Sequence, residues 1–235
     1  MKSLAIFHPS SELYGADRIM VAALQATPDS TKKIVYLLSN GPLVDYIYKN
    51  VENVDVIVNE KMPVIYRAIF TPFGVFKFLF RLLSFYKFLK QEKLKYNFDL
   101  IYVNTLSCSL ILPLLSLLKL KSFIHVHEII DSPKIVGIIT AKIARRYASK
   151  VVCVSHAVQK GLLRYDSKIK NRSIVLHNGI NPLNLLPTEK EDSLTQFYLF
   201  GRIKPEKGQW FLANTIAKLS PSELKSSHFT LVGSP

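Results

Sequence analysis

The sequence contains little cysteine, little glycine and few acidic side chains. Its 235 residues include 2 Cys, 9 Gly and 17 Asp plus Glu against 31 Lys plus Arg, which leaves a formal charge of +14. Cys108 and Cys153 lie in apolar surroundings with no short metal-ligand spacing between them, so we expect reduced, buried thiols in a cytoplasmic protein. The basic excess favours anionic partners, among them nucleic acid, membrane surfaces and phosphorylated ligands.

A long hydrophobic run is also lacking. The longest apolar stretch, LILPLLSLLKL at residues 110–120, is well short of the roughly 18 residues expected of a membrane span. The apolar run at the N-terminus is too short for a signal peptide. Hydrophobic residues at 49% and charged residues at 20% are typical of a globular chain. We therefore expect a soluble protein, or one that attaches to a membrane from one side.

Continuous apolar runs alternate with helical patterns along most of the chain. Runs without polar alternation are typical of strands that are buried on both faces. The expected strands are Ser3–His8, Lys33–Ser39, Val54–Asn59, Leu100–Asn104, Ser122–His127, Val151–Ser155 and Ile174–His177. The expected helices are Ala16–Leu24, Leu43–Lys49, Val75–Lys95, Ser107–Leu118, Lys134–Ala148 and His156–Leu163. This order predicts an α/β fold with a parallel sheet, whose ligands bind at the carboxyl ends of the strands.

The loop after the first expected strand, HPSSELYGADR, contains a single glycine, so the GxGxxG dinucleotide fingerprint is absent. Gly15 can bring the backbone close to a ligand where the helix starts, with Asp17 and Arg18 beside it. The simpler interpretation is an ordinary strand-to-helix turn in which Asp17 supplies a first-turn charge. The residues alone favour that simpler interpretation.

Two histidines and a glutamate end the fifth expected strand. In a strand, His125 and His127 point to the same face, and Glu128 follows at the carboxyl end. The pattern is compatible with a metal site, with a hydrogen-bonded histidine pair under the sheet, or with His127 contacting a polar substrate. No further His or Cys lies nearby in the sequence, so metal binding is the least favoured of the three.

A turn-rich connection at residues 181–193 separates this sheet from a second pattern of strand, loop and helix. The loop of that pattern reads GRIKPEKGQ, and it leads into a helix whose free N–H groups and positive dipole end favour anions. Arg202 offers a planar fork to phosphate oxygens and Lys207 a mobile point charge. The alternative is a pair of solvated loop charges.

Taken in order, these motifs resemble the family 4 glycosyltransferases, which have the GT-B fold of two facing Rossmann-like domains. The resemblance implies an N-terminal acceptor-side domain at residues 1–180, the linker 181–193, and the first part of a C-terminal donor-binding domain at residues 194–235. The motifs that carry the resemblance are Gly15, His127-Glu128, VCVSHAV at 152–158, HNGI at 177–180, Gly201-Arg202 and Lys207-Gly208.

The resemblance also implies a chemistry. Enzymes of this family transfer a sugar from a nucleotide-diphosphate donor to glycan or lipid-linked acceptors, with retention of configuration, and many serve cell-surface polysaccharide synthesis. Negative charge then grows on the leaving phosphate, and groups placed for that charge accelerate the reaction. The implied site consists of His127 as the catalytic contact to the donor sugar, Gly201, Arg202, Lys207 and Gly208 at the donor phosphates, and Gly15, Asp17, Arg18 and Glu128 on the acceptor side. The resemblance further implies transfer without a metal or another cofactor, and the lack of an Asp-x-Asp in the sequence is consistent with that expectation.

The segment Val75–Lys95 carries a narrow polar and basic stripe on an otherwise aromatic and aliphatic helix. The stripe consists of Lys77, Arg81, Ser84, Lys87 and Gln91. Such a helix suits an anionic bilayer, which would place the protein on the inner face of the cell membrane. The alternative, a crossover helix packed on the sheet, has equal weight. Nucleic-acid binding is disfavoured, because no RNA-binding or helix-turn-helix signature accompanies the charge.

The sequence ends at HFTLVGSP, directly after the second expected strand of the second domain. In the family that the motifs resemble, a later helix carries two glutamates, E-x7-E, that contact the donor. We therefore expect this chain alone to transfer sugar poorly or not at all. It is interpreted as a fragment of a larger enzyme, as a half-enzyme completed by a second chain, or as a non-catalytic binding module. An epimerase of nucleotide sugars is a remote fourth interpretation.

Overall fold

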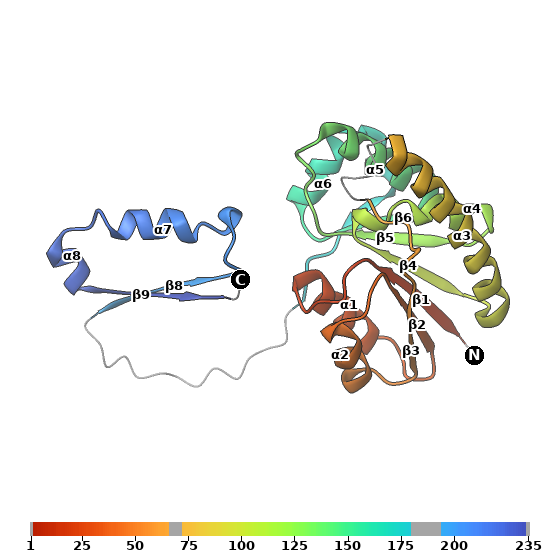
Figure 1. The fold of residues 1–235 in the computed structure, drawn as a ribbon, viewed down its shortest axis with the longest axis horizontal. Coiled ribbons are helices and arrows are strands. Elements are labelled where there is room, and N and C mark those ends of the chain that lie inside the picture. The colour runs from red at the N-terminus through yellow and green to blue at the C-terminus, as the bar shows by residue number, and fades with distance from the viewer. Residues whose placement is uncertain (1, 66–71, 180–193, 234–235) are drawn as a thin grey trace. The chain divides into compact units, whose positions relative to one another are not determined.

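The computed structural model describes residues 2–65, 72–179 and 194–233 (Figure 1). The chain divides into two compact units, Met1–Ile180 and Asn181–Pro235. The expected linker at residues 181–193 lies outside the described residues. Each unit is described by itself below.

The first unit is built on a parallel sheet with the strand order β3-β2-β1-β4-β5-β6-β7. Its strands are β1 Ser3–His8, β2 Lys32–Leu37, β3 Val54–Val58, β4 Leu100–Asn104, β5 Ser122–Val126, β6 Lys150–Cys153 and β7 Ser173–Val175. The predicted α/β fold with a parallel sheet is confirmed, and each expected strand is present with ends that differ by a few residues.

Helices cover both faces of this sheet (Figure 1). They are α1 Gly15–Gln25, α2 Pro42–Asn50, α3 Pro72–Tyr96, α4 Ile111–Leu117, α5 Lys134–Tyr147 and α6 His156–Leu163. In β1, Leu4 and Ile6 pack with α1 and α2, whereas Ala5 and Phe7 face the larger core formed with α3 to α6. Both faces of the strand are apolar for this reason. Cys108 and Cys153 are free and buried, as predicted.

The order of the strands decides which side chains meet. Since β1 and β4 are hydrogen-bonded neighbours and β4 also pairs with β5, their carboxyl ends share one edge of the sheet. His8 ends β1 and Asn104 ends β4, although these residues are 96 positions apart in the chain. His127 follows the end of β5 at the same edge.

Helix α3 packs on the sheet with one half and exposes apolar residues with the other. Phe85 and Leu89 are fully buried in the larger core. The preceding turns expose large apolar side chains, with Phe76 74% and Phe80 69% exposed. The buried residues agree with the interpretation of Val75–Lys95 as a crossover helix packed on the sheet, whereas the membrane interpretation stays a prediction. No helix among the described residues is long and apolar enough to cross a membrane.

The second unit contains a parallel strand pair with two helices in the crossover. Its elements are β8 Thr195–Phe200, α7 Gln209–Ile216, α8 Pro221–Lys225 and β9 Ser227–Val232. The predicted order of strand, basic loop, helix and second strand is confirmed. Among the residues of 194–233 whose side chains the structure describes, none is buried, and Trp210 and Phe211 are 76% and 79% exposed.

Candidate active site at the carboxyl edge of the sheet

A buried polar pair lies where β1 leads into α1. The ring nitrogen Nε2 of His8 is 2.5 Å from Oδ1 of Asp17, and the two side chains are 1% and 2% exposed. The second carboxylate oxygen of Asp17 accepts the backbone N–H of Tyr14 at 2.6 Å. Burial favours the protonated acid, but these hydrogen bonds and the nearby His8 outweigh it, so the pKa of Asp17 lies below its ordinary value.

This placement corrects the expectation for Asp17. The sequence-based hypothesis assigned the side chain to an acceptor. In the structure the carboxylate is buried, where it contacts His8 and accepts the backbone N–H that precedes the first turn of α1. The simpler interpretation, a first-turn charge in a strand-to-helix turn, describes its position. Arg18 remains exposed, where its Nε donates to the carbonyl oxygen of Leu13 at 3.2 Å.

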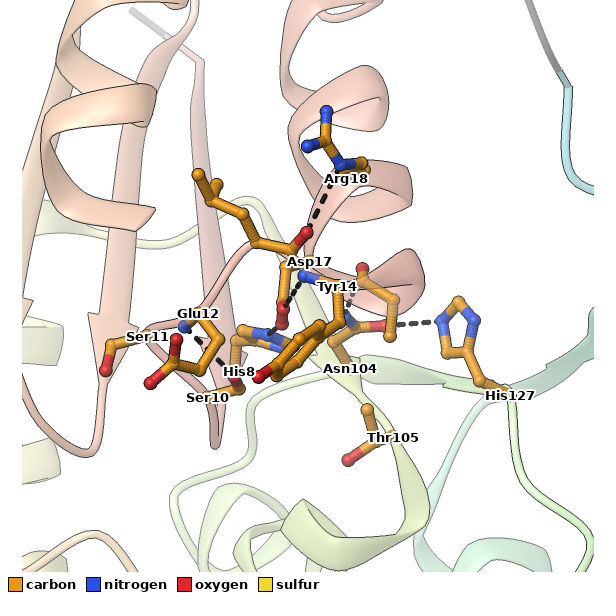
Figure 2. A network of polar contacts seen from close by, with 12 residues as sticks. His8, Ser10, Ser11, Glu12, Tyr14, Asp17, Arg18, Asn104, Thr105 and His127 are labelled. Carbon is orange, nitrogen blue, oxygen red and sulfur yellow. Dashed lines mark hydrogen bonds and ion pairs between the residues drawn. The ribbon is translucent and has the colours of Figure 1, made fainter. Parts of the chain in front are cut away.

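Asn104 joins this pair to His127, which follows β5 (Figure 2). Its amide nitrogen lies 2.9 Å from Nδ1 of His8. Its amide oxygen lies 2.9 Å from the Tyr102 hydroxyl and 2.8 Å from Nε2 of His127. One buried amide therefore contacts residues at the ends of β1, β4 and β5.

His125 and His127 share one side of the sheet, as predicted, with ring centroids 4.3 Å apart. His125 is buried, and its Nδ1 lies 2.8 Å from the Tyr102 hydroxyl. Burial lowers the pKa of His125 to about 4. Burial, followed by the neighbouring His125 and His8, also lowers the pKa of His127 to about 4. Both rings are thus neutral at neutral pH.

Glu128 points back to the backbone rather than outward. Its carboxylate accepts the N–H of Leu106 at 3.2 Å and 3.3 Å, and the N–H of His127 at 3.0 Å. Burial raises the pKa of Glu128, while the backbone hydrogen bonds oppose that rise. The acceptor-side role of Glu128 stays a prediction, but the structure shows that the side chain ties the loop after β4 to the end of β5.

Gly15 lies exposed at the first residue of α1. A Cβ atom built at this position meets no atom within 4 Å. Packing of the protein therefore does not require glycine here, and the prediction that Gly15 lets a ligand approach the backbone stays open to test. Among the described residues, no group of three or more His, Cys, Asp or Glu side chains could hold a metal ion.

The basic loop of the second unit connects β8 to α7 through a short 3-10 turn at Pro205–Lys207. Gly208 takes a left-handed conformation, with φ 80°, and caps α7. The Gln209 side chain donates to the carbonyl oxygens of Gly201 and Arg202 at 3.2 Å and 2.8 Å. These bonds hold the loop against the start of the helix.

The strand ends of this unit approach each other closely. A Cβ atom at Gly233 would lie 1.9 Å from the carbonyl oxygen of Gly201, so only glycine fits there. A hollow of about 120 Å³ opens beside these strand ends and is lined by Leu199, Gly201, Ile203, Gln209, Leu231, Val232 and Gly233. Lys207 is exposed next to Gly201.

Sequence reasoning missed four residues of these sites. His8, Tyr102, Asn104 and Gln209 were not predicted to contribute. The sequence contained a usable signal for two of them, because His8 and Asn104 are polar residues that directly follow an apolar run at the end of a strand.

Solved structures of other proteins share this fold. HepE (Alr3699) of Anabaena in complex with UDP and glucose superposes with a TM-score of 0.73 at 20% identity, over 100% of this chain and 61% of that chain. A glycosyltransferase of Rickettsia africae ESF-5 superposes with a TM-score of 0.68 at 18% identity, over 99% of this chain and 60% of that chain. Sucrose-phosphate synthase of Thermosynechococcus elongatus superposes with a TM-score of 0.63 at 16% identity, over 99% of this chain and 62% of that chain. The chain thus spans about three-fifths of the length of these proteins.

These likenesses define the fold class as α/β of the GT-B type, with a Rossmann-like parallel-sheet unit followed by a smaller unit. The sequence profile of Glycosyltransferase Family 4 matches residues 43–182, which is 140 of the 235 residues. The chain belongs to this family. A search of curated protein sequences found no significant match.

Proposed function

We propose that the protein serves the transfer of a sugar from a nucleotide-diphosphate sugar to a glycan or lipid-linked acceptor. The observation that carries the proposal is the neutral His127 at the carboxyl edge of the sheet, in a chain of a glycosyltransferase family. This edge is where parallel α/β sheets bind ligands. The complexes of HepE with UDP and glucose and with UDP-glucose support a nucleotide sugar as the donor.

The finer features of the reaction are also proposals. Transfer proceeds with retention of configuration and without a metal ion or other cofactor, and it contributes to cell-surface polysaccharide synthesis. His127 contacts the donor sugar, and Gly15, Arg18 and Glu128 lie toward the acceptor. The absence of a metal-binding cluster among the described residues is compatible with this chemistry but does not establish it.

The basic loop supplies the donor-phosphate contacts in this proposal. Arg202 and Lys207 stand on a loop that the Gln209 side chain holds in place, flanked by Gly201 and Gly208. A guanidinium and an ammonium group beside a helix start can bind the oxygens of a leaving diphosphate and stabilise the charge that develops there.

Calorimetric titration of the chain with UDP tests the donor site. A charge-assisted hydrogen bond contributes about 1.5–3 kcal/mol, so Arg202→Ala with Lys207→Ala weakens UDP binding by at least about tenfold. Lys218→Ala with Lys225→Ala is the matched control, because both lysines are exposed in the same unit and the charge change is identical. Equal affinity of the two double variants would mean that the basic loop is ordinary surface charge.

We further propose that α3 docks on an anionic membrane and that the protein works in the cytoplasm on the inner face of the cell membrane. Val75, Phe76, Leu79, Phe80 and Leu83 are 46–74% exposed on the same half of the helix. The neighbouring Lys77 and Lys87 are exposed as well. Aromatic and aliphatic side chains beside cationic ones suit the interface of an anionic bilayer.

A second candidate function is a binding module that pairs with a separate chain carrying the remaining donor contacts. The exposed Trp210 and Phe211, in a unit whose described residues include no buried side chain, favour it. Turnover of UDP-glucose by the purified chain distinguishes the two. Robust transfer rejects the binding module, whereas UDP binding without transfer rejects the self-sufficient enzyme.

A further inference from the structure

The direction of each hydrogen bond around Asn104 follows from the groups that surround it. An ionised Asp17 only accepts, so Nε2 of His8 donates to it and carries a proton. The amide nitrogen of Asn104 lies 2.9 Å from the other ring nitrogen of His8 and 3.4 Å from the carbonyl oxygen of Ala16. A carbonyl oxygen cannot donate, so the NH₂ group of Asn104 faces this side.

The amide oxygen of Asn104 must then face Tyr102 and His127. An amide oxygen accepts only, so the Tyr102 hydroxyl donates to it at 2.9 Å and Nε2 of His127 donates to it at 2.8 Å. Because the Tyr102 proton is used in this way, Nδ1 of His125 donates to the Tyr102 oxygen. The neutral ring of His127 therefore carries its single proton on Nε2.

The other nitrogen of His127 is left with a lone pair. Nδ1 has no partner among the described residues, and it is not one of their buried unpartnered atoms. Figure 2 shows it directed away from Asn104, on the outer side of the network. A lone pair at this position accepts a hydrogen bond from a hydroxyl group and repels the oxygens of a phosphate or carboxylate.

We propose that Asn104 is a positioning residue that holds His127 in the Nε2–H tautomer and so makes Nδ1 an acceptor for a hydroxyl group of the bound ligand. The tautomer follows from the hydrogen-bond network together with the ionised Asp17 and the neutral His127 ring, and it does not depend on the identity of the ligand. The identification of the hydroxyl as one of the donor sugar rests on the proposed function. The ligand portion at His127 is accordingly an uncharged polyol, with its phosphates held elsewhere.

Long-range ¹H–¹⁵N NMR of the full chain tests the tautomer without any ligand. Protonated and unprotonated ring nitrogens resonate far apart, and His127→Gln assigns the His127 signals. We expect a protonated Nε2 and an unprotonated Nδ1, and a mixture of both tautomers in Asn104→Ala. A protonated Nδ1 in the unmodified chain, or an unchanged spectrum of Asn104→Ala, would overturn the proposal.

Two further variants keep the test decisive. Tyr102→Phe removes the second donor to the same amide oxygen and is expected to leave the His127 tautomer unchanged, whereas a change would show that Asn104 is not the determinant. Asn104→Asp retains size and acceptor but adds a charge beside His127, so the pKa of His127 rises above about 4. If Asn104→Ala does not fold, an unchanged His127 pKa in Asn104→Asp overturns the proposal.

Addition of UDP-glucose tests the ligand class. The Nδ1 resonance is expected to shift with saturating UDP-glucose and to stay in place with UDP, which lacks the sugar. No shift at saturation overturns the assignment of a hydroxyl partner. If calorimetry detects no binding of UDP-glucose, the proposed function and the hydroxyl assignment fail together, while the ligand-free spectra still decide the role of Asn104.

Discussion

The carboxylate of Glu128 accepts a hydrogen bond from the backbone N–H of the adjacent His127, with 3.0 Å between Oε2 and the nitrogen. The same carboxylate accepts the N–H of Leu106, which follows Thr105. Thr105 has a positive φ of 72°, an uncommon conformation for a β-branched residue. Glu128 thus links an uncommon turn after β4 to the backbone that carries His127.

Glu128→Gln is expected to destabilise the first unit by about 1–3 kcal/mol. The Leu106 N–H contacts both carboxylate oxygens, so in either orientation of the new amide its NH₂ group faces this N–H, and a donor meets a donor where the carboxylate now accepts. Urea denaturation followed by circular dichroism measures the loss. Glu12→Gln is the control, because Glu12 is exposed and the chemical change is the same. Equal unfolding midpoints of both variants would contradict the linking role of Glu128.

Stability of the first unit is expected to fall as the pH drops from about 6.5 to about 4. The pKa values of His125 and His127 are about 4 in the folded chain against an ordinary 6.5, so the unfolded chain binds more protons in this window. The stability that the neutral His125 and His127 rings contribute to the folded unit is fully present above pH 6.5. His125→Gln should flatten the dependence, whereas His228→Gln, at an exposed site, should not. Free energies of unfolding measured from pH 7 to pH 4 check this prediction, and the same pH dependence in both variants would contradict it.

Gly15→Ala separates a structural from a functional need for glycine. The added methyl group meets no atom within 4 Å, and alanine has a higher helix propensity than glycine, so stability is expected to stay equal or to rise slightly. Transfer to the acceptor is expected to fall at least about tenfold if a ligand approaches the backbone here. The measurements are thermal unfolding and initial transfer rates. Unimpaired transfer would remove Gly15 from the acceptor side.

Binding to lipid vesicles is expected to depend on the exposed half of α3. Phe76→Ser with Phe80→Ser removes two aromatic anchors, each with a contribution of about 1.5–3 kcal/mol, so binding to phosphatidylglycerol vesicles falls at least about tenfold. Trp210→Ser with Phe211→Ser is the control, because these side chains are equally exposed in the second unit. Docking through α3 would be contradicted if both double variants lost binding equally. It would also be contradicted if the unmodified chain bound uncharged phosphatidylcholine vesicles as tightly as phosphatidylglycerol vesicles.

The amino-acid sequence by itself determined the alternation of strands and helices and the family. Apolar runs without polar alternation can only be satisfied by burial on both faces, which is why β1, β2 and β4 were predicted within a few residues. The order of short motifs, from Gly15 to Gly208, was sufficient to indicate a glycosyltransferase of family 4, to which the chain belongs. The basic loop after β8 was found from its flanking strand and helix patterns.

Only the tertiary structure decided which polar groups meet. The crossovers between β1, β4 and β5 bring His8 and Asn104 into contact, although the two residues are 96 positions apart in the sequence. Local sequence patterns do not predict contacts between residues so far apart along the chain. Burial then decided between the alternative roles that the sequence had left open for these side chains. It turned Asp17 inward, lowered the pKa of His127, and placed the free nitrogen of that ring at the edge where strands of a parallel sheet present their ligands.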